Sequence, residues 1–160
     1  MFDEIKEFRD KIGHAMKWHR DSPRHIALLV DGPNILRKEF RISLADIKRE
    51  LERFGILKVA KVYLDQYAPE KLIEAVTNLG FEPVITCTDV DVLMSVEATE
   101  LIFDDNIDII AVMTRDADFQ PVIRKAKERG KETIVVGTDP GFSNALKNTA
   151  DYIINISELK

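Results

Sequence analysis

Short apolar segments alternate strictly with longer mixed segments from residue 25 to the end of the chain, and this alternation constrains the fold more than any other feature. Six segments have the length and apolar content of strands: 25–30, 56–64, 81–87, 107–113, 132–137 and 151–156. The segments between them predict helices over 43–54, 68–79, 91–104, 117–129 and 141–149. Strands and helices alternating at this spacing build βαβ units. We therefore expect an α/β fold of three αβα layers with a mostly parallel central sheet.

Residues at the predicted boundaries agree with this assignment. The strands are near-continuous apolar runs, as expected where both faces of a parallel sheet are covered by helices. Ser43 is a predicted N-cap, with Asp46 three residues later. Glycines 55, 80 and 130 stand where helices should end.

The domain organisation follows from length and from one break near the start. A chain of 160 residues is expected to form one domain. Residues 3–19 have the apolar spacing of an amphipathic helix, and the sequence from Asp21 to Pro23 breaks it. We expect a helical appendage over residues 1–22 and the main domain over 23–160. The appendage, which carries Trp18, either packs on the helical layer or mediates association with a partner, including a second copy of the chain.

Composition excludes several classes of protein. The chain is 45% apolar and 32% charged, which is typical of globular proteins and not of disordered ones. No apolar run is long enough to span a bilayer, and the charged N-terminus lacks the apolar segment of a signal peptide. The expectation is a cytoplasmic protein without membrane contact. The single cysteine, Cys87, lies in a predicted strand and is expected to be buried and inert.

Four aspartates follow predicted strands and are the candidate catalytic and metal-binding residues. Asp31 follows the first strand, Asp91 the third, and Asp116 and Asp118 the fourth. Ligands of open α/β sheets bind beyond the carboxyl ends of the strands. Carboxylates that converge there repel one another unless a cation lies between them, and oxygen ligands suit Mg²⁺ or Mn²⁺. Each aspartate alone could simply cap a helix, but the combination favours a metal site that hydrolyses phosphodiesters.

Other chemistries are poorly supported by the sequence. No GxGxxG or Walker motif is present. All three histidines, at positions 14, 19 and 25, precede the body of the first strand, so none is available for a triad at the sheet edge. A Toprim domain would have a glutamate after its first strand, where this chain has Asp31. The Arg-x₄-His spacing of metal-independent ribonucleases occurs twice, and such a short match arises easily by chance.

The net charge of −5 argues against an extended nucleic-acid-binding face. Basic residues nevertheless cluster in two places. One group, which includes Arg124 and Lys127, lies on a predicted helix, where it could also be an ordinary solvated face. The other group lies beside the Asp31 loop and consists of Arg37, Lys38 and Arg41.

The motifs together resemble the NYN domains, specifically the LabA-like branch, of the PIN-like nuclease group. The matches run from Val30 to Asn34, over Val90-Asp91-Val92 with acidic Glu97, and from Thr114 to Phe119. The segments 141–146 and 150–153 fit the end of the domain, so the resemblance covers about residues 25–156. Two positions depart from the family pattern. Thr88 and Asp89 stand where many relatives have a lysine, and Arg115 stands where many have glycine, which makes Arg115 the candidate to replace that lysine.

The resemblance implies a PIN-like sheet and metal-dependent hydrolysis of RNA, with Mg²⁺ or Mn²⁺ as the cofactor. Asp31, Asp91 and Asp116 would hold the metal, and Asp118 would ligate it or orient the attacking water. The expected substrate-binding residues are Asn34, Thr114, Arg115, Arg124 and Lys127, and Glu97 would support the metal ligands. Two other functions remain open: an RNA- or protein-binding module of the same fold that does not cleave, and a regulator that acts through the N-terminal helix.

Overall fold

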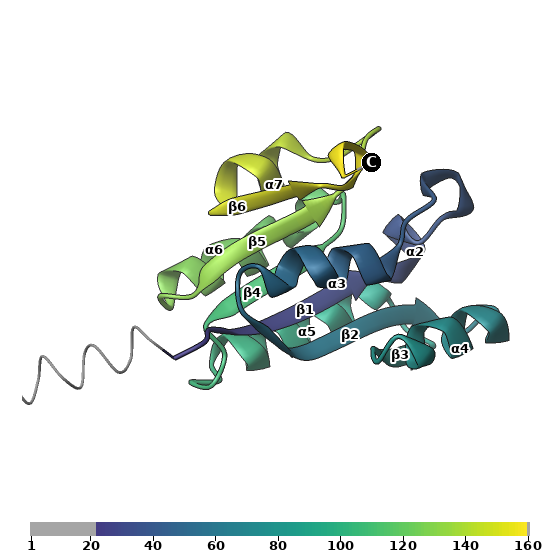
Figure 1. Cartoon of the computed structure of the whole chain (residues 1–160), viewed down its shortest axis with the longest axis horizontal. Coiled ribbons are helices and arrows are strands. Elements are labelled where there is room, and N and C mark those ends of the chain that lie inside the picture. The colour runs from purple at the N-terminus through teal and green to yellow at the C-terminus, as the bar shows by residue number, and fades with distance from the viewer. Residues whose placement is uncertain (1–21, 160) are drawn as a thin grey trace, which may run out of the picture.

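The computed structural model describes residues 22–159 and contains a six-stranded parallel sheet (Figure 1). The strands lie in the order β3-β2-β1-β4-β5-β6, and every neighbouring pair is parallel. Their bounds are β1 His25–Asp31, β2 Ile56–Asp65, β3 Glu82–Thr86, β4 Ile109–Met113, β5 Glu132–Gly137 and β6 Tyr152–Asn155. The predicted parallel α/β fold is therefore confirmed.

Helices cover both faces of this sheet, which gives three layers. Helices α3 (Leu44–Glu52) and α4 (Glu70–Asn78) pack on one face, and α5 (Val90–Ile102), α6 (Gln120–Glu128) and α7 (Asn144–Thr149) pack on the other. Each face has its own apolar core, because successive residues of a strand point to opposite sides. Leu28 of β1 belongs to the core under α3, and Leu29 belongs to the core under α5 and α6.

The central strands fix the position of the candidate site. From Ile26 to Val30, every residue of β1 is fully buried, as is the whole of β4. The chain runs outward from β1 to β3 on one side and from β4 to β6 on the other. The carboxyl ends of β1 and β4 therefore flank the point where the strand order reverses, and that is where open α/β sheets bind ligands.

Helix ends follow the predicted signals. The Ser43 hydroxyl accepts the Asp46 backbone N–H at 3.2 Å and caps α3. Gly80 and Gly130 follow α4 and α6 with φ of +82° and +77°, the left-handed conformation that favours glycine. Gly55 serves a different purpose, because a Cβ there would lie 2.2 Å from the carbonyl oxygen of Arg24.

Some details differ from the expectations. Strand β3 ends at Thr86, so Cys87 lies beyond the strand and is exposed, and the expectation of burial was wrong. The helix predicted over 117–129 is divided into a 3₁₀ turn, η2 (Ala117–Phe119), and α6, whose first turn contains Pro121. Three further short elements were not predicted: α2 (Gly32–Ile35), η1 (Lys38–Phe40) and η3 (Ile156–Glu158).

The predicted N-terminal helix over 3–19 lies outside the described residues. Within residues 22–159, no helix is long and apolar enough to cross a membrane.

Candidate metal and catalytic site

An acidic cleft of about 360 Å³ lies at the carboxyl edge of the sheet. Three of the four predicted aspartates line it: Asp31 from the end of β1, Asp91 from the first turn of α5, and Asp116 from the loop after β4. Other lining residues include Asn34, Arg37, Asp65, Thr88 and Asp89. The structure thus brings together acids that are far apart in the sequence.

Asp31 is the buried member of this group, with an exposed fraction of 2%. Its Oδ2 accepts the Thr114 hydroxyl at 3.0 Å, and its Oδ1 accepts the Asn34 backbone N–H at 3.4 Å. Burial raises the pKa of Asp31 from 3.8 to about 6, against the lowering effect of the Thr114 hydrogen bond. The negative charges of Asp91 and Asp116 raise this pKa further. Folding has therefore placed a carboxylate where its charge is poorly compensated.

Asp91 does not cap the helix on which it lies. The N-cap of α5 is Asp89, whose Oδ1 accepts the Asp91 backbone N–H at 2.8 Å. The pKa of Asp91 is raised first by burial, and then by the charges of Asp89, Asp116 and Asp118. The carboxylate of Asp91 is thus a second acid of the cleft whose ionisation its neighbours oppose.

Asp116 and Asp118 have different surroundings. Asp116 caps η2, because its Oδ1 accepts the Asp118 backbone N–H at 2.9 Å. One of its oxygens is therefore used in capping while its side chain still lines the cleft. Asp118 is exposed and does not line the cleft, although its charge acts on Asp91.

Thr114 and Asn34 join the ends of β1 and β4. Thr114 is fully buried; its hydroxyl donates to Asp31 and accepts the Asp116 backbone N–H at 3.2 Å. The Asn34 side-chain oxygen accepts the Arg115 backbone N–H at 2.9 Å. Thr114 therefore holds Asp31 in place and is too buried to contact a substrate directly. Since the amide oxygen of Asn34 is already used, its NH₂ group is the part that can donate to a substrate.

The remaining predicted residues lie away from the cleft. The Arg115 side chain lines a neighbouring pocket instead. Glu97 accepts the Tyr63 hydroxyl and binds Lys61 at 3.0 Å, so it links α5 to β2; although burial opposes it, these hydrogen bonds lower the pKa of Glu97. Lys127 binds Asp151 at 3.2 Å. Asp151 directly precedes β6, so this ion pair lies at the amino edge of the sheet, opposite the cleft. Arg124 is exposed on the same helix.

Sequence reasoning missed two acids of the cleft, Asp65 and Asp89. Asp65 is the last residue of β2, so it satisfies the same rule that identified Asp31, namely an acid where an apolar strand ends. Asp89 immediately precedes α5 and was considered only as a position where relatives have a lysine. Its helix-capping contact explains why an acid occupies that position here.

The donor set has the chemistry of a divalent cation site. Carboxylate oxygens predominate, and no ion pair compensates Asp31, Asp91 or Asp116 within the described part of the chain. Among residues 22–159, no three acidic, histidine or cysteine side chains are grouped closely enough to hold one ion as they stand. Mg²⁺ is commonly bound through one or two carboxylates, with waters and substrate phosphates completing its octahedron. The residues present therefore fit such an ion in kind and in charge.

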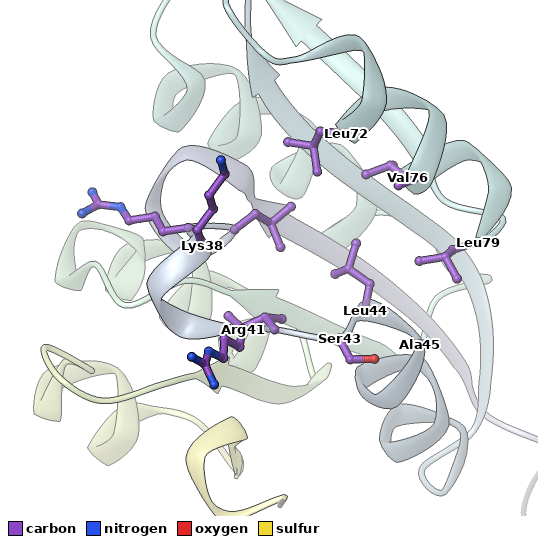
Figure 2. Close-up of a pocket in the computed structure, with 12 residues that line it drawn as sticks. Lys38, Arg41, Ser43, Leu44, Ala45, Leu72, Val76 and Leu79 are labelled. Carbon is purple, nitrogen blue, oxygen red and sulfur yellow. The ribbon is translucent and has the colours of Figure 1, made fainter.

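A separate apolar pocket of about 450 Å³ lies beside the cleft and is not part of it. Figure 2 shows Leu44, Leu72, Val76 and Leu79 lining this pocket, with Lys38 and Arg41 at its rim. It contains no acidic residue. The apolar pocket thus lacks the carboxylates that characterise the cleft.

Together, the parallel sheet and the acids at its reversal point define an α/β protein of PIN-like architecture. The sequence matches the NYN domain family over residues 25–157, and the chain belongs to that family. It is 56% identical over 158 residues to an uncharacterized protein of Methanocaldococcus jannaschii, covering 99% of this chain and 65% of that protein. The chain therefore spans slightly less than two thirds of that relative's length.

A solved structure shares the fold. The crystal structure of a protein of unknown function from Vibrio parahaemolyticus superposes with a TM-score of 0.77 at 22% identity. The superposition covers 87% of this chain and 96% of that one. At this identity the likeness establishes the architecture alone.

Proposed function

We propose that this protein is a divalent-metal-dependent ribonuclease of the LabA-like branch, which hydrolyses RNA phosphodiester bonds in the acidic cleft. The observation that carries the proposal is the setting of Asp31. This carboxylate is buried at the strand-order reversal, has a pKa raised to about 6, and faces the charges of Asp91 and Asp116. Perturbed acids gathered in a cleft are typical of catalytic sites. Membership of the NYN family supports the same reading.

Each residue of the cleft has a proposed role. Asp31, Asp91 and Asp116 would hold Mg²⁺ or Mn²⁺, with Asp65 and Asp89 adding negative charge. A bound ion would supply Lewis-acid stabilisation of the phosphate and lower the pKa of a water molecule. Asp118, which is exposed beside Asp91, would orient the attacking water or bind the ion.

Neutral and basic residues would position the RNA. The free NH₂ group of Asn34 would donate to a phosphate oxygen, and Thr114 would fix the orientation of Asp31. Within residues 22–159, Arg37 is the one basic residue that lines the cleft, and its Nε donates to the Pro33 carbonyl at 3.2 Å. Its guanidinium is thus placed to meet a phosphate at the same edge. Arg124 and Lys127 remain proposed contacts for a more distant part of the RNA.

A cleavage assay tests the proposal directly. Purified full-length protein would be incubated with end-labelled single-stranded RNA in Mn²⁺, in Mg²⁺ and in EDTA. We expect cleavage with either metal, none in EDTA, and a loss of at least about a hundredfold in Asp31→Asn while RNA binding is retained. Asp105→Asn is the matched control, because Asp105 is an exposed acid just before β4, at the opposite edge of the sheet.

The assay also separates the alternatives. Cleavage that survives in EDTA or in Asp31→Asn would assign the activity to other residues or to a contaminant, and would refute the proposed site. RNA binding without any metal-dependent cleavage would instead support a binding module of the same fold.

A further inference from the structure

A second pocket, of about 490 Å³, lies next to the acidic cleft and has a different chemical character. Its walls come from the η1 segment, the loop after β4, the loop after β5, and η3. Its lining includes Arg37, Phe40, Arg115, Thr138, Pro140 and Ser157. They supply two guanidinium groups, an aromatic ring and two hydroxyls, whereas the cleft supplies mainly carboxylates.

Arg115 builds the inner wall of this pocket. Its Nη1 donates to the Pro140 carbonyl at 2.6 Å, and its Nη2 donates to the Asn34 carbonyl at 3.2 Å. The guanidinium carbon lies 4.4 Å from the centre of the Phe40 ring, which is a stacking distance. The Nε is buried and has no hydrogen-bond partner in the described chain. Arg115 thus joins α2, η1 and the loop after β5.

The loop after β5 is shaped to accept this arginine. Gly141 has φ of +88°, and a Cβ at this position would lie 3.0 Å from Nη1 of Arg115. A side chain at 141 would therefore press on the guanidinium that donates to Pro140. Glycine at position 141 leaves room for the Arg115 guanidinium, so the pocket is already formed without a ligand.

The pocket adjoins the acidic cleft. Arg37 lines both, and Asn34 lines the cleft while its carbonyl accepts Arg115 from the pocket side. A chain molecule with one phosphate in the cleft would reach the second pocket with its adjacent unit.

The lining of the pocket matches one nucleotide. A nucleobase can stack on aromatic rings and on the plane of an arginine guanidinium. Thr138 and Ser157, whose hydroxyls are 2.9 Å apart, offer polar contacts to a base edge or ribose. Two acids also line the pocket. Asp139 is already engaged by the Asn155 amide at 3.1 Å and by Lys147 at 4.0 Å, and Glu39 is exposed.

We propose that this second pocket binds the nucleotide next to the scissile phosphate, with its base stacked against the Phe40–Arg115 pair. The proposal rests on the ribonuclease function proposed above. It assigns to Arg115 a role in base recognition, in place of direct stabilisation of the phosphate in the cleft. A base held there would fix which phosphodiester lies among the carboxylates.

An abasic scan tests the proposal. A set of single-stranded RNA oligonucleotides, each lacking one base at a successive position, would be cleaved in Mn²⁺ by the wild-type full-length protein and by Phe40→Ala. Base stacking on an aromatic side chain is worth roughly 5- to 150-fold. We expect wild type to lose about that much kcat/KM at one position adjacent to the cleaved bond. Phe40→Ala should have that loss already with intact RNA and should show no further loss at that position.

Two variants serve as controls. Phe103→Ala removes a second phenylalanine that lies under an arginine, since Arg129 lies 4.3 Å from its ring centre, and Phe103 lines neither pocket. Tyr67→Ala removes an aromatic ring that is 82% exposed near Asp65, at the other end of the cleft. Neither should abolish the position-specific loss.

The affinity of Asp31→Asn protein for the same abasic oligonucleotides, measured in EDTA, tests the subsite separately from the proposed activity. Position-specific loss of affinity without cleavage by wild type would leave the subsite standing and remove the nuclease function. Cleavage with no position-specific difference between wild type and Phe40→Ala would overturn the subsite alone. The subsite would be overturned equally if the dependence were lost in Tyr67→Ala instead, or if Phe40→Ala weakened all substrates uniformly.

Discussion

At the scale of single residues, Asp31 carries its charge at a cost to the folded state. Burial raises its pKa from 3.8 to about 6, so the folded protein binds this proton more tightly than the unfolded chain does. The stability that the folded state gains by binding this proton is fully present below about pH 4 and is lost as the pH rises through about 6. The loss in free energy of unfolding is roughly 3 kcal/mol at most. In metal-free protein, Asp31→Asn should equal wild type near pH 4 and become more stable than wild type by pH 7.

Urea unfolding in EDTA at a series of pH values measures this difference. Because many carboxylates titrate in the same range, the informative quantity is the wild-type value minus the variant value at each pH. A constant difference for Asp31→Asn between pH 4 and 7 would show that the pKa of Asp31 is not raised.

Thr114 permits a second prediction at this scale, with a matched control elsewhere in the molecule. Its hydroxyl donates to Asp31 and accepts the Asp116 backbone N–H. Thr133 is also fully buried, donates to Asp151 at 2.9 Å and accepts the Asp151 backbone N–H at 3.0 Å, but it lies at the opposite edge. Valine at either position should cost about 1–3 kcal/mol of stability, because buried polar groups lose their partners.

Cleavage distinguishes the two threonine variants. Thr114→Val should also lower metal-dependent cleavage and raise the pKa of Asp31. Thr114→Ser keeps the hydroxyl, so its cleavage rate and its Asp31 pKa should both stay close to those of the wild type. Thr133→Val should leave the rate per folded molecule unchanged. Equal rates for Thr114→Val and Thr133→Val, corrected for the folded fraction, would reduce Thr114 to a structural role.

At the scale of elements, the two groups of basic residues differ in position and in existing contacts. Arg37, Lys38 and Arg41 lie on the segment between α2 and α3, and they make no ion pair within the described chain. Lys127 of α6 already binds Asp151 and the Thr149 carbonyl. A free cation beside the cleft can replace counterions on RNA without breaking an ion pair first. We therefore expect the segment before α3 to dominate RNA affinity.

Salt dependence measures this difference between the two elements. Replacing Arg37, Lys38 and Arg41 together by alanine should weaken binding and reduce the slope of log K against log salt by about one for each lost phosphate contact. The pair Arg124→Ala and Lys127→Ala should change the slope less. A larger change in slope from the α6 pair would indicate that the RNA runs along α6 and away from the carboxyl edge.

The elements also show how far the sequence could predict this molecule. Apolar runs such as β4 identified every strand, because burial on both faces leaves little room for polar residues. The three acids Asp31, Asp91 and Asp116 were placed on one edge by the same reasoning. Periodicity identified the basic helix face that carries Lys127, but it did not reveal that this charge is paired with Asp151 at the far edge of the sheet. The Phe40–Arg115 stack was invisible, because it joins loops whose conformation no periodic pattern predicts.

At the scale of the whole molecule, the cleft exists only when β1, β2, β4 and α5 are assembled, so a metal ion that binds there should stabilise the entire fold. Binding to the folded state alone stabilises it by RT ln(1 + [L]/Kd), which is about 2.7 kcal/mol at a hundred times Kd. For a domain of this size each kcal/mol raises Tm by about 2–4 °C. Millimolar Mn²⁺ or Mg²⁺ should therefore raise Tm by several degrees relative to EDTA, with the larger effect at pH 7 than at pH 5. Protons compete for Asp31 at the lower pH, because its pKa is about 6.

Asp116→Asn should abolish most of the metal effect, and it should melt at or above the wild-type temperature in EDTA because one repelling charge is gone. Identical melting curves of the wild type with metal and with EDTA at pH 7 would contradict a metal site in the cleft.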